Sequence, residues 1–157
     1  EGIMVLAAFV LGFPGETKET LSDNISFIEQ TGIDFYSLKE FYYQENTPIS
    51  TNSEEFGLTG MGKNWSHDTM DNSDISKHLV ALFREIKGSV FIDPDTSLWY
   101  LAYMYDQGYE MHEIKKIQTL INEGVSSQLD GNFDDNHSAF NEIQNLVLKR
   151  DLVSGTL

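Results

Sequence analysis

The residues best suited to chemistry form a short turn behind an apolar segment. Residues 3–11 are apolar throughout, and Gly12-Phe13-Pro14-Gly15-Glu16-Thr17 follows them directly. Glycines let a ligand approach the backbone, and the start of the next helix offers free N–H groups. The turn lacks the lysine of a P-loop and the spacing of a dinucleotide fingerprint. We therefore expect Gly12, Phe13, Pro14, Gly15 and Glu16 to bind a cofactor; the alternative is an ordinary strand-to-helix turn.

A second group of candidates lies in a loop further along the chain. His67 follows a glycine-rich stretch and is flanked by Trp65, Asp68 and Thr69. A histidine binds or releases a proton near neutral pH, so we expect His67 to contact substrate or to carry a proton. The alternative is a histidine that pins the loop by hydrogen bonding. Trp65 is expected to line the substrate side of the same site.

Tyr42 and Tyr43 come at the end of a predicted strand and are expected near the same site. Successive strand residues point to opposite faces, so one tyrosine should line the pocket while the other packs against a helix. Core packing is the alternative for both residues.

No resident metal site is predicted within the chain. His78, His112 and His137 form neither an HExxH motif nor a pair four residues apart. The chain has no cysteine, which excludes disulfides, a cysteine nucleophile and a cysteine-held iron–sulfur cluster within these residues. The absence of cysteine also fits a cytoplasmic protein.

These residues need a strand, a helix and a second strand to position them. The apolar run 3–11 predicts a buried strand, and residues 17–31 predict a helix with Thr17 as N-cap and Gly32 as C-cap. Residues 34–43 are rich in aromatic residues and predict a second strand, parallel to the first. The fold class is therefore α/β, beginning with one βαβ unit.

The rest of the chain predicts a long loop and then helices. Residues 44–72 are rich in turn formers, with a short helical turn near 53–56. Helices are expected from Ser73 towards Gly88, from Pro94 to Gly108, from Glu110 to Glu123 and around 140–147. Gly124 should end the third helix, a polar linker should span 126–135, and aromatic residues 99–105 should pack in the core or at its rim. We expect three parts, at 1–47, 48–72 and 73–157.

Net charge and hydropathy narrow the choice of partners. The 157 residues include 10 Lys and Arg against 25 Asp and Glu, a net charge of −15. Such a surface repels phosphate, so we expect no nucleic acid to bind this segment directly. No apolar run approaches the roughly 20 residues of a membrane helix, and no secretory signal is visible, so no membrane partner is predicted.

The turn and its neighbours carry a resemblance to a known family. An apolar strand, Gly-Phe-Pro-Gly-Glu-Thr and a helix with Phe27-Ile28 resemble the fifth strand and loop of radical S-adenosylmethionine (SAM) enzymes, most closely the cobalamin-binding class. Phe41-Tyr42-Tyr43 and Asn46-Thr47-Pro48-Ile49 resemble the sixth strand and its exit loop. Two later segments are similar to a subgroup of phosphinate P-methyltransferases and peptide-modifying enzymes: Glu55-Phe56-Gly57-Leu58 and Trp65-Ser66-His67-Asp68-Thr69-Met70. The resemblance covers roughly residues 1–125.

The resemblance implies a partial (β/α) barrel remnant followed by a helical C-terminal subdomain. It also implies that the chain is the C-terminal part of a longer parent polypeptide and supplies part of a SAM and substrate pocket. The parent would hold the iron–sulfur cluster in a CxxxCxxC loop, together with any cobalamin. It would cleave SAM to a 5′-deoxyadenosyl radical and then abstract hydrogen or transfer a methyl group to a small-molecule or peptide substrate. Without cysteine, this chain alone would be inactive.

Two other functions remain open from the sequence. Residues 73–150 could form an acidic helical module that binds a peptide without catalysis. An unrelated α/β enzyme could instead hold a different nucleotide-like ligand at the turn. A CxxxCxxC motif upstream of Glu1 would favour the radical SAM interpretation. The open edge of strand 3–11 also predicts pairing with the parent chain or with a second copy.

Overall fold

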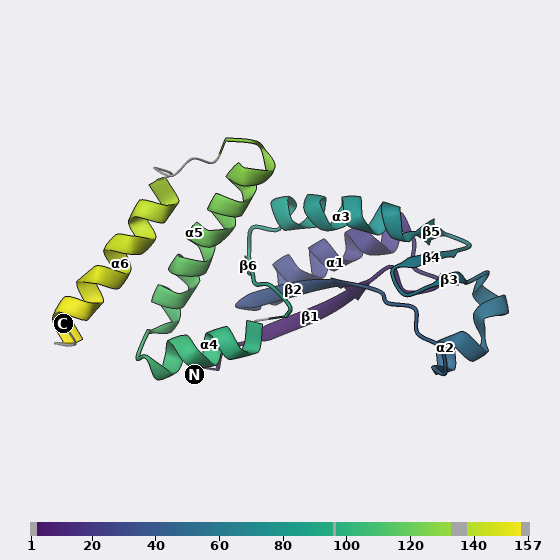
Figure 1. Cartoon of the computed structure of the whole chain (residues 1–157), viewed down its shortest axis with the longest axis horizontal. Coiled ribbons are helices and arrows are strands. Elements are labelled where there is room, and N and C mark those ends of the chain that lie inside the picture. The colour runs from purple at the N-terminus through teal and green to yellow at the C-terminus, as the bar shows by residue number, and fades with distance from the viewer. Residues whose placement is uncertain (1–2, 96, 133–137, 155–157) are drawn as a thin grey trace. The chain divides into compact units, whose positions relative to one another are not determined.

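The computed structural model describes residues 3–95, 97–132 and 138–154, and it is a mixed α/β structure (Figure 1). The chain forms two compact units. The first comprises Glu1–Ser89 together with Asp93–Asp95, and the second comprises Val90–Ile92 together with Thr96–Leu157.

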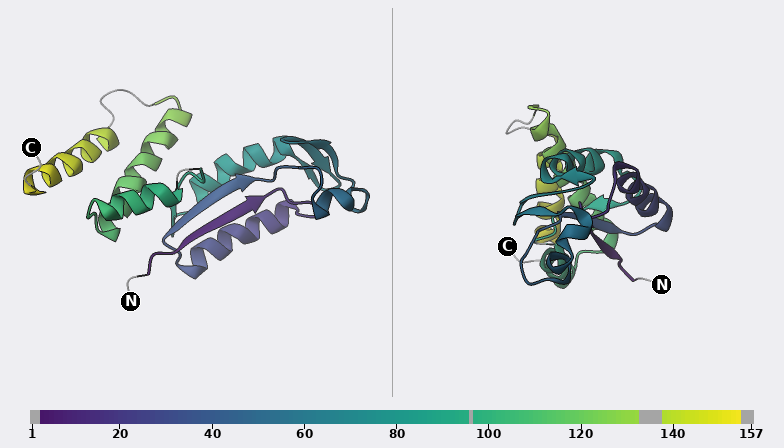
Figure 2. Two further views of the ribbon diagram at one scale, coloured as in Figure 1. Left: turned by 60° about the horizontal axis from the view of Figure 1, so that its bottom comes forward. Right: turned by 90° about the vertical axis from the view of Figure 1, so that its right-hand side faces the viewer.

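The first unit begins with the predicted βαβ arrangement. Strand β1 (Leu6–Leu11), helix α1 (Lys18–Thr31) and strand β2 (Phe35–Glu40) follow one another along the chain. The two strands pair in parallel, from Leu6 opposite Phe35 to Leu11 opposite Glu40, and lie side by side in Figure 2. Parallel pairing brings the carboxyl ends of β1 and β2 to one edge, where Gly12 and Phe41 leave the strands.

Local signals define helix α1 at both ends, as predicted. The Thr17 hydroxyl accepts a hydrogen bond from the Thr20 amide, while the Thr20 hydroxyl accepts one from the Thr17 amide, which forms a capping box. Gly32 ends the helix in the left-handed conformation, at φ 63°. Leu21 and Ile28 bury the inner face of the helix.

The two faces of β1 differ in how well they are covered. Phe9 meets Phe27 of α1 edge to face at 6.1 Å between ring centres, and Leu11 is fully buried. Ala8 and Val10 alternate with these residues and therefore point to the opposite face, where both are exposed. Among the described residues, β1 stands at the end of its sheet, with β2 on one side only.

Residues 44–72 contain more structure than the predicted loop. Helix α2 (Pro48–Thr51) and the predicted short turn η1 (Ser53–Phe56) lead into an antiparallel sheet of three strands: β3 (Thr59–Met61), β4 (Asn64–His67) and β5 (Met70–Asp71). These strands have two to four residues each, too few to show a clear period-two pattern.

Helix α3 (Asn72–Glu85) completes the first unit. Its N-cap is Asp71, whose carboxylate accepts the Asp74 amide at 2.9 Å, so the predicted cap at Ser73 is wrong. The helix also ends at Glu85, before Gly88. Ile75 and Leu82 are buried, and α3 packs with β2, β4 and β5.

The second unit contains the short strand β6 (Val90–Phe91) and helices α4 (Ser97–Asp106), α5 (Met111–Leu129) and α6 (Ser138–Ser154). Helix α5 packs against α6 and continues through Gly124, so the predicted end at Glu123 is wrong. Helix–helix packing here outweighs the low helix propensity of one glycine. Residues 126–129 of the predicted linker are helical, whereas His137 lies outside the described residues.

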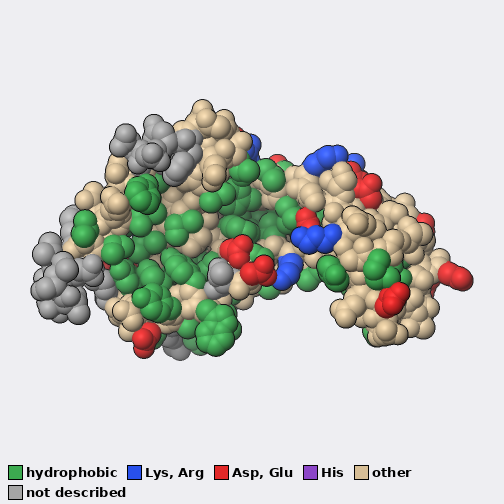
Figure 3. Space-filling model, in the orientation of Figure 1, with side chains coloured by type: hydrophobic (Ala, Val, Ile, Leu, Met, Phe, Trp, Pro, Cys, Tyr) green, Lys and Arg blue, Asp and Glu red, His purple; other side chains and the backbone are tan. Residues whose placement is uncertain are grey.

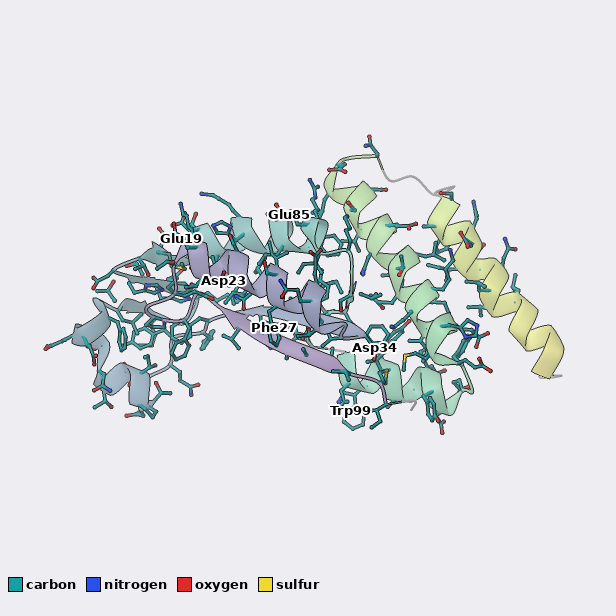
Figure 4. All side chains as sticks on the ribbon, turned by 180° about the vertical axis from the view of Figure 1, so that it is seen from behind. Glu19, Asp23, Phe27, Asp34, Glu85 and Trp99 are labelled. Carbon is teal, nitrogen blue, oxygen red and sulfur yellow. The ribbon has the colours of Figure 1, made fainter. Side chains whose placement is uncertain are left out.

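Helix α4 exposes aromatic side chains that the sequence predicts in the core or at its rim. Trp99 is 80% exposed and projects outward from the helix in Figure 4. The helix is apolar on nearly all sides, so it cannot bury each of its side chains against one neighbour. Hydrophobic side chains gather on the face of this unit shown in Figure 3, and the exposed apolar residues of α4 are Leu98, Trp99, Tyr103 and Tyr105.

Candidate functional site

The candidate site lies at the carboxyl ends of β1 and β2. Phe41 follows β2, and its amide donates to the Leu11 carbonyl at 2.7 Å, which extends the pairing of the two strands by one residue. Phe13 follows β1, and its ring meets the Phe41 ring edge to face at 5.2 Å between centres. The two strand exits are therefore in direct contact.

Gly12 is required by protein packing. Its φ of 82° lies in the left-handed region, which favours glycine. A β-carbon at this position would lie 2.6 Å from Cη2 of Trp65 and 2.7 Å from Cγ1 of Ile75. Trp65 and Ile75 therefore occupy the space that the sequence suggests for a ligand.

Glu16 forms hydrogen bonds within the loop through its carboxylate and its amide. The Glu16 carboxylate accepts the Gly12 amide at 2.5 Å and the Asn24 side-chain amide at 3.3 Å. The Glu16 amide in turn donates to the Phe13 carbonyl at 2.9 Å. Glu16 thus closes the turn from within, and its carboxylate oxygens already have partners.

Phe13 and Gly15 remain accessible in this loop. The Phe13 side chain is 49% exposed, whereas Pro14 is buried. Gly15 has φ 94°, and a β-carbon there would meet only Phe56, at 3.9 Å. Of the five predicted cofactor-binding residues, Phe13 and Gly15 therefore offer surface to a ligand.

Trp65 and His67 lie beneath the loop. Their rings stack with 4° between planes and 5.3 Å between centres. Trp65 is 2% exposed and donates from Nε1 to the Phe41 carbonyl at 2.7 Å. His67 is 7% exposed, and its Nε2 lies 3.3 Å from the Gly12 carbonyl oxygen. Both residues contact the predicted cofactor loop, and their roles towards substrate remain predictions.

Tyr42 and Tyr43 differ in exposure, although the predicted strand 34–43 ends before both of them. β2 ends at Glu40, and both residues follow it. Tyr43 is buried and forms an isolated antiparallel bridge with Gly62. Tyr42 is exposed and lies over Gly62, where a β-carbon would be 3.4 Å from the Tyr42 hydroxyl. Tyr42 is thus the tyrosine that a substrate could reach.

Three residues near the site were not singled out from the sequence. The Thr69 hydroxyl donates to the Glu16 carbonyl at 2.5 Å and lies 3.0 Å from Nδ1 of His67. Phe41 joins Phe13 and Trp65 through its ring and carbonyl group. Glu40 accepts from the Ser76 hydroxyl at 2.9 Å and lies 3.5 Å from the Lys63 ammonium group. The position of Glu40 at a strand end could have indicated it.

Two electrostatic effects accompany β2. Burial raises the pKa of the Tyr36 phenol well above its ordinary value. The Lys39 ammonium group donates to Asp95 at 2.7 Å, and this hydrogen bond lowers the pKa of the Asp95 carboxyl. Both Lys39 and Asp95 are largely exposed, so solvent screens the pair.

Within the described part of the chain, no group of three or more His, Cys, Asp or Glu residues could hold a metal ion. The helices in that part are also too short or too polar to cross a bilayer.

Comparison with known proteins gives partial and distant similarities to radical SAM methylthiotransferases. The tRNA-2-methylthio-N(6)-dimethylallyladenosine synthase of Shewanella baltica is 53% identical over 34 residues, which are 22% of this chain and 7% of that protein. The ribosomal protein uS12 methylthiotransferase RimO of Nitratidesulfovibrio vulgaris is 25% identical over 120 residues, 75% of this chain and 27% of RimO. No model of a protein family and no solved structure matches.

This chain therefore spans about a quarter or less of the length of these relatives. The similarity supports the radical SAM part of the resemblance. It does not support the cobalamin-binding class.

Proposed function

We propose that this chain is part of a radical SAM enzyme and forms one wall of its SAM and substrate pocket. The observation that carries the proposal is the similarity to RimO, which extends over three quarters of the chain. The parallel βαβ unit is consistent with it, because ligands of α/β folds bind at the carboxyl ends of parallel strands. Gly12–Glu16 leaves β1 at that end.

The exposed parts of β1 are consistent with a partial barrel that further strands complete. Val10 is 55% exposed although it lies in an apolar strand, and Val5 and Ile3, which precede β1, are exposed as well. An apolar strand with one open edge and one open face gains stability when another strand covers it. The remainder of a parent polypeptide is the partner we propose.

The residues of the site fit SAM in part and do not fit an iron–sulfur cluster. A cluster needs cysteine thiolates, and this chain has none, so the parent would have to supply them. For SAM, the half-exposed ring of Phe13 and the open backbone of Gly15 offer contact surface. Gly12 and Pro14 are buried and would support the loop from below. A reduced cluster supplies the electron that cleaves bound SAM, and no residue described here takes that role.

A polypeptide substrate suits this segment better than a nucleic acid. The names of the relatives refer to a tRNA nucleoside in one case and to a ribosomal protein in the other. The net charge of −15 opposes the approach of a phosphate backbone and attracts basic protein segments. We propose a peptide or protein as substrate, with exposed Tyr42 on the substrate side.

The kind of group transferred separates two versions of the proposal. The relatives are methylthiotransferases by name, which favours methylthio transfer. The Gly12–Thr17 motif resembles the cobalamin-binding class, and Trp65-Ser66-His67 resembles its P-methyltransferase subgroup, which favours methyl transfer. Cobalamin content of the purified parent distinguishes them: bound cobalamin supports methyl transfer, and cobalamin-free activity supports methylthio transfer.

The proposal is tested by SAM binding to the polypeptide that includes the coding sequence upstream of Glu1. We expect a CxxxCxxC motif within about 200 residues upstream, the size of a barrel of this type. Phe13→Ala should raise the Kd for SAM about three- to tenfold, because an aromatic contact is lost. Phe27→Ala is the matched control, since Phe27 is 54% exposed but lies on α1 beside Phe9. Absence of the motif, or equal effects of the two variants, would contradict the proposal.

A further inference from the structure

Three side chains of one short segment donate to backbone carbonyls at the two strand exits. Trp65 Nε1 donates to the carbonyl of Phe41, which follows β2. His67 Nε2 reaches the carbonyl of Gly12, which follows β1, and the Thr69 hydroxyl donates to the carbonyl of Glu16, just before α1. We refer to Trp65, His67 and Thr69 as the carbonyl clamp.

The protonation of His67 follows from its partners. A carbonyl oxygen only accepts, so Nε2 carries the proton in the contact with Gly12. In the neutral ring Nδ1 is then an acceptor, and the Thr69 amide lies 3.4 Å from it. The single hydroxyl proton of Thr69 is engaged with Glu16. The Thr69 amide and the stacked Trp65 ring therefore orient the His67 ring for its contact with the Gly12 carbonyl.

The side chains of β4 alternate between a buried and an exposed face. Trp65 and His67 are buried on one face, whereas Asn64 and Ser66 are exposed on the other. Ser66 pairs with Thr59 across the strands, at 2.9 Å between the hydroxyl oxygens. The buried side of β4 therefore contacts both strand exits: the Trp65 ring fills the space beside Gly12 and bonds to the Phe41 carbonyl, and His67 lies within hydrogen-bond distance of the Gly12 carbonyl.

We propose that the carbonyl clamp positions the Gly12–Glu16 loop so that Phe13 and Gly15 stay presented to the cofactor. Trp65, His67 and Thr69 act on the cofactor through the loop and are positioning residues. The inference that this geometry serves SAM rests on the proposed function; the inference that the clamp orders the loop does not. Glu16 closes the turn internally and Phe13 contacts Phe41 at the exit of β2, while His67 and Thr69 of the clamp connect the loop to β4 and to the turn that follows it.

The test is hydrogen exchange of the Gly12 and Glu16 amides in the 157-residue chain, since both amides are hydrogen-bonded within the loop. Thr69 is exposed, so Thr69→Val removes the hydroxyl without opening the core. We expect this variant to speed exchange of both amides about three- to tenfold, the loss of one neutral hydrogen bond. The amide of Leu38 in β2 should be unaffected.

Two matched variants keep the test specific. Thr69→Ser retains the hydroxyl and should restore wild-type exchange, and Ser66→Ala on the opposite face should change neither amide. The proposal that the clamp orders the loop would be overturned if Thr69→Val left the exchange rates unchanged, or if Thr69→Ser accelerated exchange as much as Thr69→Val. His67→Phe, which keeps a ring to stack on Trp65, should accelerate exchange of the same amides.

SAM binding to the parent polypeptide separates the two proposals. If the wild-type parent binds SAM, Thr69→Val should raise the Kd about three- to tenfold and Thr69→Ser should leave it near the wild-type value. If Thr69→Val accelerates amide exchange but leaves the Kd for SAM unchanged, the proposed link between the clamp and the cofactor is wrong. Failure of the wild-type parent to bind SAM contradicts the proposed function, whereas the exchange result still decides whether the clamp orders the loop.

Discussion

At Gly12, the space that a β-carbon would occupy is already filled. A glycine at the end of a strand suggests room for a ligand, and here Trp65 and Ile75 use that room. The glycine that remains open is Gly15, three residues later. Residue type alone does not distinguish these two cases, because both glycines have positive φ and follow the same strand.

A pair of glycine substitutions measures this difference. Gly12→Ala should lower the free energy of unfolding by about 2–5 kcal/mol, from left-handed strain and overpacking against Trp65. Gly32→Ala should lower the free energy of unfolding by about 1–2 kcal/mol, from left-handed strain alone, because no atom lies within 4 Å of its added β-carbon. Urea denaturation of both variants provides the comparison. Equal losses would mean that Trp65 and Ile75 do not pack on Gly12 in solution.

At the scale of elements, the sequence predicted the βαβ unit because each part has a local signal. The apolar run marks β1, and Thr17 and Gly32 mark the ends of α1. The antiparallel strands β3, β4 and β5 were missed, since two to four residues carry too little pattern. The link between Thr69 and Glu16 was missed for a related reason: it depends on how those strands fold back, which no local motif encodes.

The cap of α1 gives a prediction at this scale. Thr17→Ala should lower the free energy of unfolding by about 1 kcal/mol, because the Thr20 amide loses its side-chain acceptor. Thr17→Ser should stay within a few tenths of a kcal/mol of wild type, since the hydroxyl remains. Thermal unfolding followed by circular dichroism measures both variants. A Thr17→Ala variant as stable as Thr17→Ser would show that the capping box does not define the start of the helix.

At the scale of the whole molecule, three properties fit our proposal that this chain is one part of a larger enzyme. The matched segments cover 7% and 27% of the two relatives, the chain has no cysteine, and within its described part strand β1 has an uncovered apolar edge and face. The sequence resembles the radical SAM family, and the similarity to the two relatives supports that family but not its cobalamin-binding class. The finer choice between methylthio transfer and cobalamin-dependent methyl transfer is left to the cobalamin content of the parent polypeptide.

The most direct test of the central claim is the formation of 5′-deoxyadenosine by the parent polypeptide. The parent, loaded anaerobically with iron and sulfide and supplied with SAM and a reductant, should form this product, and the 157-residue chain treated in the same way should not. Our claim is that only the polypeptide with the upstream cysteines forms this product. A cluster-loaded parent that binds SAM but yields no 5′-deoxyadenosine above the reagent blank would contradict it.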